Sequence, residues 1–301
     1  KACNIGGGHD PPVKIEDRIL PSYPEALVNI KTIPGLDAIR EEGGVLRIGA
    51  LARLSSVAAH PVVLSKYRAL AEAAGRTASP QLRNMGTIGG NLCQDIRCWY
   101  YRGPGNRFSC LRKGGGRCYA LKGDNRFHSI FGGSVEKGCV AVHPSDTAPA
   151  LIALGASVVT SRRTINAEQF FNVRLNGTTV LEPGEIVTEI RIPEPPEGTR
   201  SAFLKFALRK AIDFPIVNCA ASLAFDHEQV ASARICLNAV HVVPRRVTGA
   251  EQMLQGRIIA DGVAGEAAEA AVQDARPLEN NAYMVQVART LVKRSILACG
   301  G

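Results

Sequence analysis

The sequence predicts an α+β protein of two domains. Short β-type runs alternate with segments of helical spacing in the first part of the chain, and longer β-type runs followed by helices fill the second. A glycine-rich stretch with almost no apolar period interrupts the first part. The 301 residues, 46% of them hydrophobic, are enough for two cores, and the composition excludes disordered, collagen-like and coiled-coil proteins.

The first domain is expected over residues 1–177. Its predicted elements are strands at 26–30, 45–48 and 156–160 and helices at 51–59 and 64–74. A further helix precedes the last of these strands. Ser145 or Asp146 can cap its first turn, and it runs to Leu154.

The second domain is expected over residues 178–301. Its β-type runs lie at 185–192, 202–208, 217–225 and 231–243, and its helices at 262–275 and 281–297. The last helix has a core-facing stripe formed by Tyr283, Val287, Leu291 and Ile296. A structural cap on the first domain is the simplest role for this half.

The insertion at residues 97–139 concentrates both charge and cysteine. It holds nine basic residues against two acidic ones, in a chain whose net charge is +9, and it contains Cys98, Cys110, Cys118 and Cys139. We expect a cytoplasmic protein, because no apolar run approaches the roughly 18 residues of a membrane span and the first residues lack the order of a signal peptide. In that reducing compartment, grouped thiols indicate metal ligands or redox groups rather than disulfides.

Two glycine loops of the first domain can bind an anionic ligand. They are Gly6-Gly7-Gly8-His9-Asp10 and Thr87-Ile88-Gly89-Gly90-Asn91. Glycine lets backbone N–H groups come close to phosphate oxygens, and Thr87 or Asn91 can add a side-chain bond. Neither loop has the spacing of the dinucleotide fingerprint or the P-loop, and each alone is typical of an ordinary turn. Two such loops in one domain favour a pyrophosphate held from both sides.

The second loop carries a resemblance to a known family. Residues 82–91, Leu-Arg-Asn-Met-Gly-Thr-Ile-Gly-Gly-Asn, strongly resemble the R-N-x-G/A-T-I-G-G-N loop of the FAD-binding medium subunit of molybdenum hydroxylases, the xanthine dehydrogenase family. The first loop resembles that family's A-G-G-H/Q/T-S/D loop. The resemblance covers nearly the whole chain and continues through Pro144-Ser145-Asp146 and Leu204-Lys205. It implies that FAD is bound by both loops together with Ser145, Asp146, Val187 and Lys205.

The resemblance also implies a fold and a set of partners. The fold is expected to be vanillyl-alcohol-oxidase-like (PCMH-type), with two α+β subdomains that hold FAD and a C-terminal domain of antiparallel sheet and helices. The chain would relay electrons between FAD and an external partner such as ferredoxin or NAD(P). It would do so beside a large molybdopterin subunit, where the substrate reacts, and a small subunit with two 2Fe-2S clusters. No catalytic residue is assigned in this chain, because the flavin would carry the chemistry.

The residues alone leave the metal of the insertion open. The spacing Cys98-x11-Cys110-x7-Cys118-x20-Cys139 lacks the close pair usual in zinc sites, and only Cys93-x4-Cys98 comes near it. Iron–sulfur cubanes accept wide spacing because each thiolate binds a different iron, while the positive charge of the insertion suits both kinds of site. The resemblance to the 4-hydroxybenzoyl-CoA reductase medium subunit, and to a periplasmic aldehyde oxidoreductase with a similar loop, implies a 4Fe-4S cluster on these four cysteines. Cys93 then lies outside the ligand set, as a packed thiol near the flavin loop.

An alternative hypothesis, from a different functional class, is a zinc-stabilised basic protein that contacts nucleic acid. Trp99, Tyr100 and Tyr101 beside basic residues offer stacking groups for a single strand, although aromatic residues next to a cluster ligand more often shield it from water. His128 and His143 are candidate metal ligands, but lone histidines in such loops are more often hydrogen-bonded. On the leading interpretation the chain contacts neither nucleic acid nor a membrane.

Overall fold

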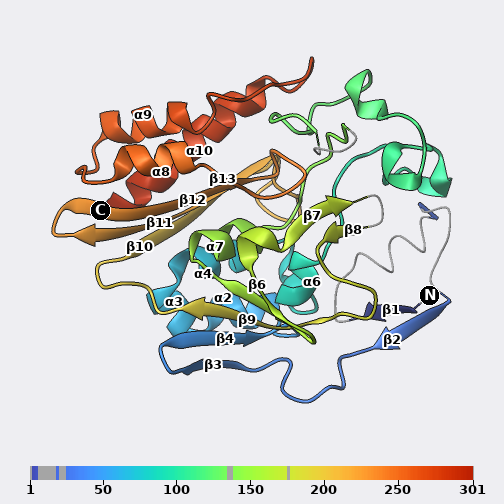
Figure 1. Ribbon diagram of the computed structural model, residues 1–301, viewed down its shortest axis with the longest axis horizontal. Coiled ribbons are helices and arrows are strands. Elements are labelled where there is room, and N and C mark those ends of the chain that lie inside the picture. The colour runs from blue at the N-terminus through green and yellow to red at the C-terminus, as the bar shows by residue number, and fades with distance from the viewer. Residues whose placement is uncertain (1, 6–17, 20–24, 134–137, 175–176, 301) are drawn as a thin grey trace.

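The computed structural model describes residues 2–5, 18–19, 25–133, 138–174 and 177–300. The first glycine loop, Gly6 to Asp10, lies outside the described residues. Within these ranges no helix is long and apolar enough to cross a membrane. Two larger antiparallel sheets, with helices between and beyond them, make up most of the molecule (Figure 1).

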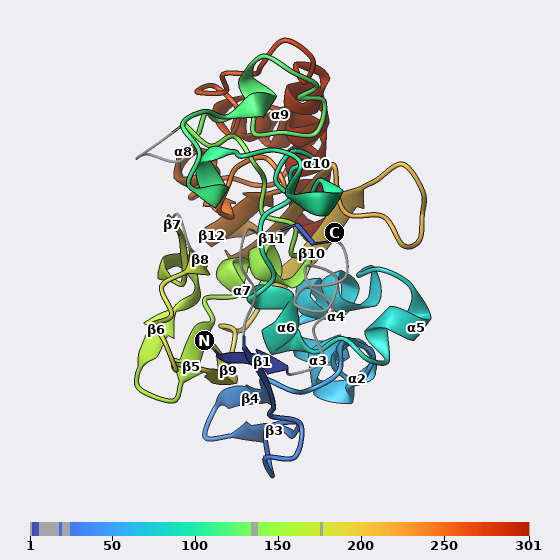
Figure 2. The same ribbon diagram turned by 90° about the vertical axis from the view of Figure 1, so that its right-hand side faces the viewer.

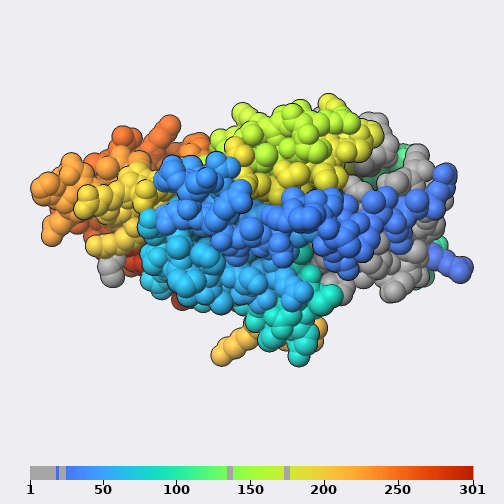
Figure 3. All heavy atoms as spheres, turned by 90° about the horizontal axis from the view of Figure 1, so that it is seen from below, coloured from blue at the N-terminus to red at the C-terminus, as the bar shows by residue number. Residues whose placement is uncertain are grey.

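The first sheet has the strand order β3-β4-β9-β5-β6, all antiparallel. Its strands are β3 (Ile39–Glu42), β4 (Val45–Gly49), β9 (Val187–Pro193), β5 (Ser157–Thr160) and β6 (Thr164–Asn166). Ile48, Ile190 and Val158 stand opposite one another on three neighbouring strands, and all three are fully buried. This face therefore carries the first core. Figure 3 shows the blue N-terminal strands from below, between light-blue and yellow-green segments.

Helices cover the buried face of this sheet. They are α2 (Leu54–Ala59), α3 (Pro61–Lys66), α4 (Arg68–Gly75), α5 (Pro80–Arg83), α6 (Ile88–Leu92) and α7 (Thr147–Ala153), with a short turn η4 (Ala167–Gln169). The helix predicted at 64–74 is in fact two helices, because Tyr67 has a non-helical backbone (φ −128°, ψ 49°) and a fully buried ring. Every residue of α7 is buried, since it packs between α4 and the second sheet.

The second sheet has the antiparallel order β10-β11-β12-β13. It consists of β10 (Arg200–Phe206), β11 (Val217–Asp226), β12 (Gln229–Asn238) and β13 (Arg245–Arg246), followed by α8 (Thr248–Leu254), α9 (Asp261–Ala270) and α10 (Tyr283–Gly300). The three helices pack on one face and bury a second core (Figure 1). The strand predicted over 231–243 stops at Asn238, because Ala239 takes a positive φ of 61°.

Strand pairing divides the chain later than residue 177. The sequence analysis assigns 185–192 to the second domain, but β9 lies between β4 and β5 in the first sheet. By this pairing the division falls between Pro193 and Arg200. Hydrophobic alternation alone does not tell which sheet a strand joins, because that depends on its distant partners.

The described residues of the insertion, 97–133 and 138–139, form turns and loops. The insertion includes the 3₁₀ turns η1 (Pro104–Asn106), η2 (Leu111–Lys113) and η3 (Tyr119–Leu121). Elsewhere in the chain, two small two-stranded sheets pair β1 (Ala2–Ile5) with β2 (Ala26–Asn29) and β7 (Phe171–Arg174) with β8 (Gly177–Thr179). A β-bridge between Arg97 and Val142 closes the base of the insertion. Figure 2 shows the insertion, turquoise to green, beside the C-terminal part of the chain. There Asn281 on the segment before α10 donates to the backbone oxygens of His128 and Ser129.

Candidate functional site

The second glycine loop forms the start of α6. Thr87 is the N-cap, and its Oγ1 accepts a hydrogen bond from the Gly90 N–H at 3.1 Å. Gly89 packs against Ala50 so closely that an added Cβ would lie 2.7 Å from the Ala50 oxygen. Ile88 is fully buried. Ile88 and Gly89 therefore hold the loop in place, while Thr87 and Gly90 line a cavity.

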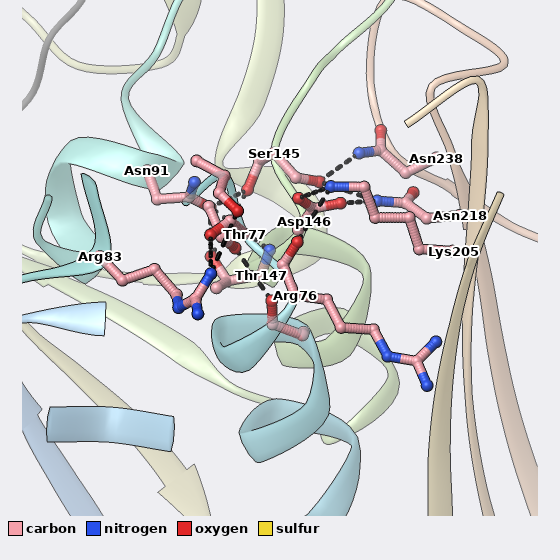
Figure 4. A network of polar contacts seen from close by, with 12 residues as sticks. Arg76, Thr77, Arg83, Asn91, Ser145, Asp146, Thr147, Lys205, Asn218 and Asn238 are labelled. Atoms are coloured by element: carbon pink, nitrogen blue, oxygen red, sulfur yellow. Dashed lines mark hydrogen bonds and ion pairs between the residues drawn. The ribbon is translucent and has the colours of Figure 1, made fainter. Parts of the chain in front are cut away.

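Asn91 joins this loop to the start of α7 (Figure 4). Its Oδ1 accepts hydrogen bonds from the Ser145 hydroxyl at 2.6 Å and from the Thr147 hydroxyl at 2.7 Å. The Ser145 Oγ in turn accepts from the Ala148 N–H at 3.0 Å, which satisfies a free donor in the first turn of α7. The side chain that serves the helix start is therefore Ser145, whereas Asp146 makes no capping bond.

Asp146 faces the same cavity and is paired inside the protein. Its Oδ2 lies 2.7 Å from the Lys205 Nζ, and its Oδ1 accepts from the Asn218 side-chain amide at 2.8 Å (Figure 4). Lys205 also donates to the Arg76 backbone oxygen. Burial raises the pKa of the Asp146 carboxyl, while Lys205 and Asn218 oppose that shift. The pair therefore fixes a buried carboxyl group at the cavity wall.

The opposite wall is held in an uncommon backbone conformation. Ala78 and Ile212 both have positive φ, 47° and 69°, and the Ile212 N–H donates to the Ala78 oxygen at 3.3 Å. A positive φ is costly for a β-branched residue such as isoleucine. Arg83, the arginine of the resembling loop, donates to the backbone oxygens of Thr77 and Ala78 and thereby supports this wall (Figure 4).

These groups enclose a cavity of about 320 Å³, here called the flavin cavity because residues that the family resemblance predicts to bind FAD line it. Among the described residues predicted to bind FAD, those that line it are Thr87, Gly90, Asn91 and Asp146. Sequence reasoning missed Arg97 and Phe214, which also line it and stack with the guanidinium carbon 3.6 Å from the ring centroid. The insertion begins at Arg97, but no sequence motif marks either residue as part of the wall of this site.

The four predicted cysteine ligands line one small cavity, here called the cysteine cavity. Cys98, Cys110, Cys118 and Cys139 come together there although they span the whole insertion. Cys110 and Cys139 belong to a small buried cluster with Ile96 and Tyr101. The described cysteines are free thiols, and burial raises the pKa of Cys98 to about 12 and that of Cys139 to about 11. A cation or metal would be needed to keep such thiols ionised.

One basic side chain, Arg112, lines the cysteine cavity, and Lys113 follows it in the chain. The buried Arg112 donates to the Gly177 oxygen at 2.9 Å, but its Nε has no hydrogen-bond partner among the described residues, and neither has the buried Nζ of Lys113. Burial lowers the pKa of Lys113, and the thiols of Cys110 and Cys98 oppose the shift. Donors without acceptors beside thiols indicate room for a negative group.

His128 touches the same cavity from outside. Its Nε2 lies 3.2 Å from the Cys98 Sγ, and burial lowers its pKa to about 4, so the ring is neutral at pH 7. Within the described part of the chain, no three His, Cys, Asp or Glu side chains are grouped so as to hold a single metal ion. A cubane does not require such convergence, because its ligands bind separate irons.

Family comparisons decide the assignment of the chain. Residues 1–195 match the FAD binding domain in molybdopterin dehydrogenase, and residues 202–299 match the CO dehydrogenase flavoprotein C-terminal domain. This chain belongs to the FAD-binding family of the molybdopterin dehydrogenases. It is an oxidoreductase subunit.

Relatives in this family cover most of the chain. The aldehyde oxidoreductase FAD-binding subunit PaoB of Escherichia coli (strain K12) is 36% identical over 243 residues, which are 77% of this chain and 74% of the relative. The carbon monoxide dehydrogenase medium chain of Hydrogenophaga pseudoflava is 30% identical over 302 residues, 98% of this chain and 88% of the relative.

Solved structures agree with the predicted fold. Carbon monoxide dehydrogenase from Hydrogenophaga pseudoflava superimposes with a TM-score of 0.76 and 28% identity, covering 99% of this chain and 89% of that chain. Quinoline 2-oxidoreductase from Pseudomonas putida 86, at 22% identity and a TM-score of 0.74, shares the fold. The PCMH-type FAD-binding domain followed by a C-terminal domain of sheet and helices is therefore confirmed.

Some residues predicted from the family resemblance lie away from the flavin cavity. Val187 is buried in the first core, and Ser145 has its hydroxyl engaged by Asn91, so their roles toward FAD stay predictions. Cys93 is the C-cap of α6, directly after the second glycine loop, and its role as a packed thiol stays a prediction. The aromatic run next to Cys98 does not form one stacking surface, because Tyr101 is buried while Trp99 is exposed.

Proposed function

We propose that this chain is the electron-transfer subunit of a heteromeric molybdenum hydroxylase and carries both FAD and a 4Fe-4S cluster. The observation that carries the proposal is that four cysteines spread over 42 positions of sequence line one cavity close to the flavin cavity. Family membership supports FAD, whereas the cluster rests on the cysteine cavity and on its charges.

The residues of the flavin cavity fit FAD. Thr87 and Gly90 place the start of α6 at the cavity, where backbone N–H groups suit phosphate oxygens. Asp146, fixed by Lys205, offers acceptor oxygens for the hydroxyl groups of the cofactor. Arg97 and Phe214 form a flat wall suited to a planar ring. The described part of the site thus offers partners for phosphate oxygens, hydroxyl groups and a planar ring of the cofactor.

The donor chemistry of the cysteine cavity, whose volume is only about 10 Å³, supports an iron–sulfur cluster. Four thiolates on a cubane leave a negative charge, and Arg112 and Lys113 are buried cations with donor atoms free of hydrogen-bond partners among the described residues. Iron binding would deprotonate thiols whose pKa burial otherwise raises. Tyr101 and Ile96 pack against the cavity and keep water from it.

FAD and the cluster would supply the electron chemistry, and the protein side chains would position both groups. Asp146 and Lys205 hold a fixed charge pair at the flavin cavity. Cys98 lies at the edge of the cysteine cavity, directly after Arg97 of the flavin cavity, so adjacent residues reach both sites. The insertion therefore brings the two redox sites close together.

The proposed function also implies partner proteins for this chain. CO dehydrogenase relatives are named as medium chains, which fits a complex with a large molybdopterin subunit and a small subunit with two 2Fe-2S clusters. Ferredoxin or NAD(P) is the proposed external electron partner, and the cytoplasm is the proposed location. The basic insertion suits an acidic protein partner such as ferredoxin.

Cofactor analysis of the purified full chain tests the proposal. We expect a yellow-brown protein with about one FAD and about four irons per chain, and no stoichiometric zinc. A yellow chain that contains FAD but no iron after anaerobic purification would refute the cluster and leave the flavin assignment. A colourless chain with zinc would instead support the basic zinc protein.

A further inference from the structure

A recess on the outer face of the first sheet lies apart from both cavities described above. It has a volume of about 340 Å³, and its lining residues are shared with neither the flavin cavity nor the cysteine cavity. Strands β3, β4, β5 and β9 contribute its floor, and the loop over residues 34–38 forms one side. The proposed function makes no use of this hollow, here called the arginine recess.

Three arginines stand side by side across the recess. Arg47 on β4 is the register partner of Arg40 on β3 and of Arg191 on β9. Successive side chains of a strand point to opposite faces, so Ile48 and Ile190 enter the first core while the arginines point away from it. Neighbouring strands are about 4.8 Å apart, so the row brings three like charges together and destabilises the sheet unless negative groups lie among them.

The recess holds more positive than negative charge. Glu189 is the one acid among its described lining residues, so three arginines against one carboxylate leave a net charge of +2. The Glu189 Oε1 accepts hydrogen bonds from the Arg191 Nε at 2.5 Å and from the Arg47 Nη1 at 3.3 Å. Its Oε2 lies 3.8 Å from the Arg40 Nη2. One carboxylate therefore serves three guanidinium groups.

The central arginine of the row keeps a donor atom without a hydrogen bond. The Nε of Arg47 is buried and donates to no described residue, although the Glu42 Oε2 lies 3.4 Å away as an ion pair. The Glu42 side chain is 65% exposed and does not line the recess. A buried donor without a hydrogen bond at the edge of a hollow leaves room there for an acceptor.

The loop over residues 34–38 gives the recess a fixed side wall. The Leu36 oxygen accepts a hydrogen bond from the Leu51 N–H at 2.7 Å, and the Ala38 oxygen accepts one from the Gly49 N–H at 2.8 Å. Gly49 lets the loop lie directly on β4, because an added Cβ would lie 2.2 Å from the Leu36 oxygen. The arginines are therefore gathered in a preformed hollow and not spread over a flat sheet.

A phosphate dianion matches both the charge and the geometry of the recess. Its two negative charges equal the net charge of the lining, whereas a second carboxylate would neutralise only half of it. Guanidinium groups bind phosphate oxygens through paired N–H donors, and arginine suits such planar, two-point contacts better than lysine does. The several oxygens of one phosphate can accept from two neighbouring arginines of the row at once.

We propose that the arginine recess binds a phosphate dianion, either inorganic phosphate or the phosphate group of a small molecule. The inference goes beyond the proposed function, because it requires neither FAD nor the cluster. The bound anion lies among Arg40, Arg47 and Arg191 and relieves their mutual repulsion. Because the folded sheet builds the row, phosphate binding stabilises the first domain.

Equilibrium dialysis of radiolabelled phosphate against the full chain at about pH 8 tests this inference, since phosphate is mainly the dianion there. We expect a saturable site whose affinity falls as salt rises. Arg47→Gln should weaken binding at least about tenfold, because it removes the central charged donor. Arg162→Gln is the matched control, since Arg162 is an exposed arginine of the same domain that does not line the recess. Phosphate held at the flavin loop would be unaffected by Arg47→Gln, so equal affinity in the two variants would overturn the proposal.

Glu189→Gln should change the affinity in the opposite direction. It removes the carboxylate that competes with the ligand for the arginines, so phosphate should bind about twofold to fivefold more tightly than to the wild type. Phosphate should also raise the melting temperature of this variant more than that of the wild type. Weaker phosphate binding by a folded Glu189→Gln chain would contradict the proposed site.

Glycerol 3-phosphate distinguishes the two sources of the phosphate group. Similar affinity for both probes supports a site for inorganic phosphate. Tighter binding of glycerol 3-phosphate supports a small phosphorylated molecule, whose organic part would contact Pro34 and Leu36 on the side wall. If neither probe binds the wild-type chain at low salt, the proposal is wrong.

Discussion

The flavin cavity and the cysteine cavity are built in opposite ways. Helix starts and loops bound the flavin cavity, and Asn91 and Asp146 at its wall are hydrogen-bonded within the chain. Turns bound the cysteine cavity, where the buried Nε of Arg112 and Nζ of Lys113 have no hydrogen-bond partner in the described ranges. The polar groups named at the first site are hydrogen-bonded within the chain, whereas these two donor atoms of the second have no hydrogen-bond partner among the described residues.

Because of this difference, the stability of the two sites should depend on their ligands to different degrees. A buried donor without an acceptor costs about 1–3 kcal/mol, so the insertion would gain stability from the anionic cluster proposed for it. The flavin cavity has its Asp146 charge paired by Lys205 and is expected to fold without its cofactor. We therefore expect the free energy of unfolding to depend on the bound ligand at the cysteine cavity and on the side-chain pairs at the flavin cavity.

The largest effect is expected from Cys110→Ser. Cys110 is buried in the small core of the insertion and is a proposed ligand, so its loss should remove the cluster and lower the melting temperature of the insertion. Iron content and protease cleavage within 97–139 measure this. Cys93→Ser is the matched control, because Cys93 does not line the cysteine cavity. Iron lost in the Cys93 variant and kept in the Cys110 variant would replace the ligand set.

Breaking the charge pair of the flavin cavity should cost less. Asp146→Asn leaves the Lys205 ammonium buried without its carboxylate, and such a loss is worth about 3–5 kcal/mol of unfolding free energy. Chemical denaturation of the FAD-free chain measures it. The double variant Asp146→Asn with Lys205→Met should recover much of the stability, because no unpaired charge remains. A single variant as stable as the wild type would show that the pair does not hold this site together.

The two glycines of the second loop should differ. An added Cβ at Gly89 would lie 2.7 Å from the Ala50 oxygen, so Gly89→Ala should cost about 1–3 kcal/mol whether or not FAD is present. Gly90 lines the flavin cavity, and Gly90→Ala should lower FAD affinity with less effect on the FAD-free chain. Denaturation curves and flavin content measure the two effects. Equal FAD loss at equal stability in both variants would contradict this division.

The sequence predicted the residue types of both sites but not their orientation. The glycine loop and the four cysteines are readable because backbone approach and thiolate ligation need those residues. The role of Gly89 in packing on Ala50 was not readable, since a motif does not say which glycine faces its own protein. Likewise Ser145 turns to Asn91, 54 residues away in sequence, and β9 joins the first sheet, because tertiary pairing decides both.

The smallest effect, and the sharpest comparison, is expected from Lys113→Met. In the iron-free chain this change removes a buried ammonium that has no hydrogen-bond partner among the described residues, so it should raise stability by about 1–3 kcal/mol. In the iron-loaded chain the same change removes a positive charge beside the thiolates of Cys98 and Cys110 and should weaken cluster retention against a chelator. Lys122→Met, at an exposed position of the same insertion, should change neither quantity. An effect of the same sign with and without iron would mean that Lys113 serves the fold alone, and that the two cavities do not differ in their need for a ligand.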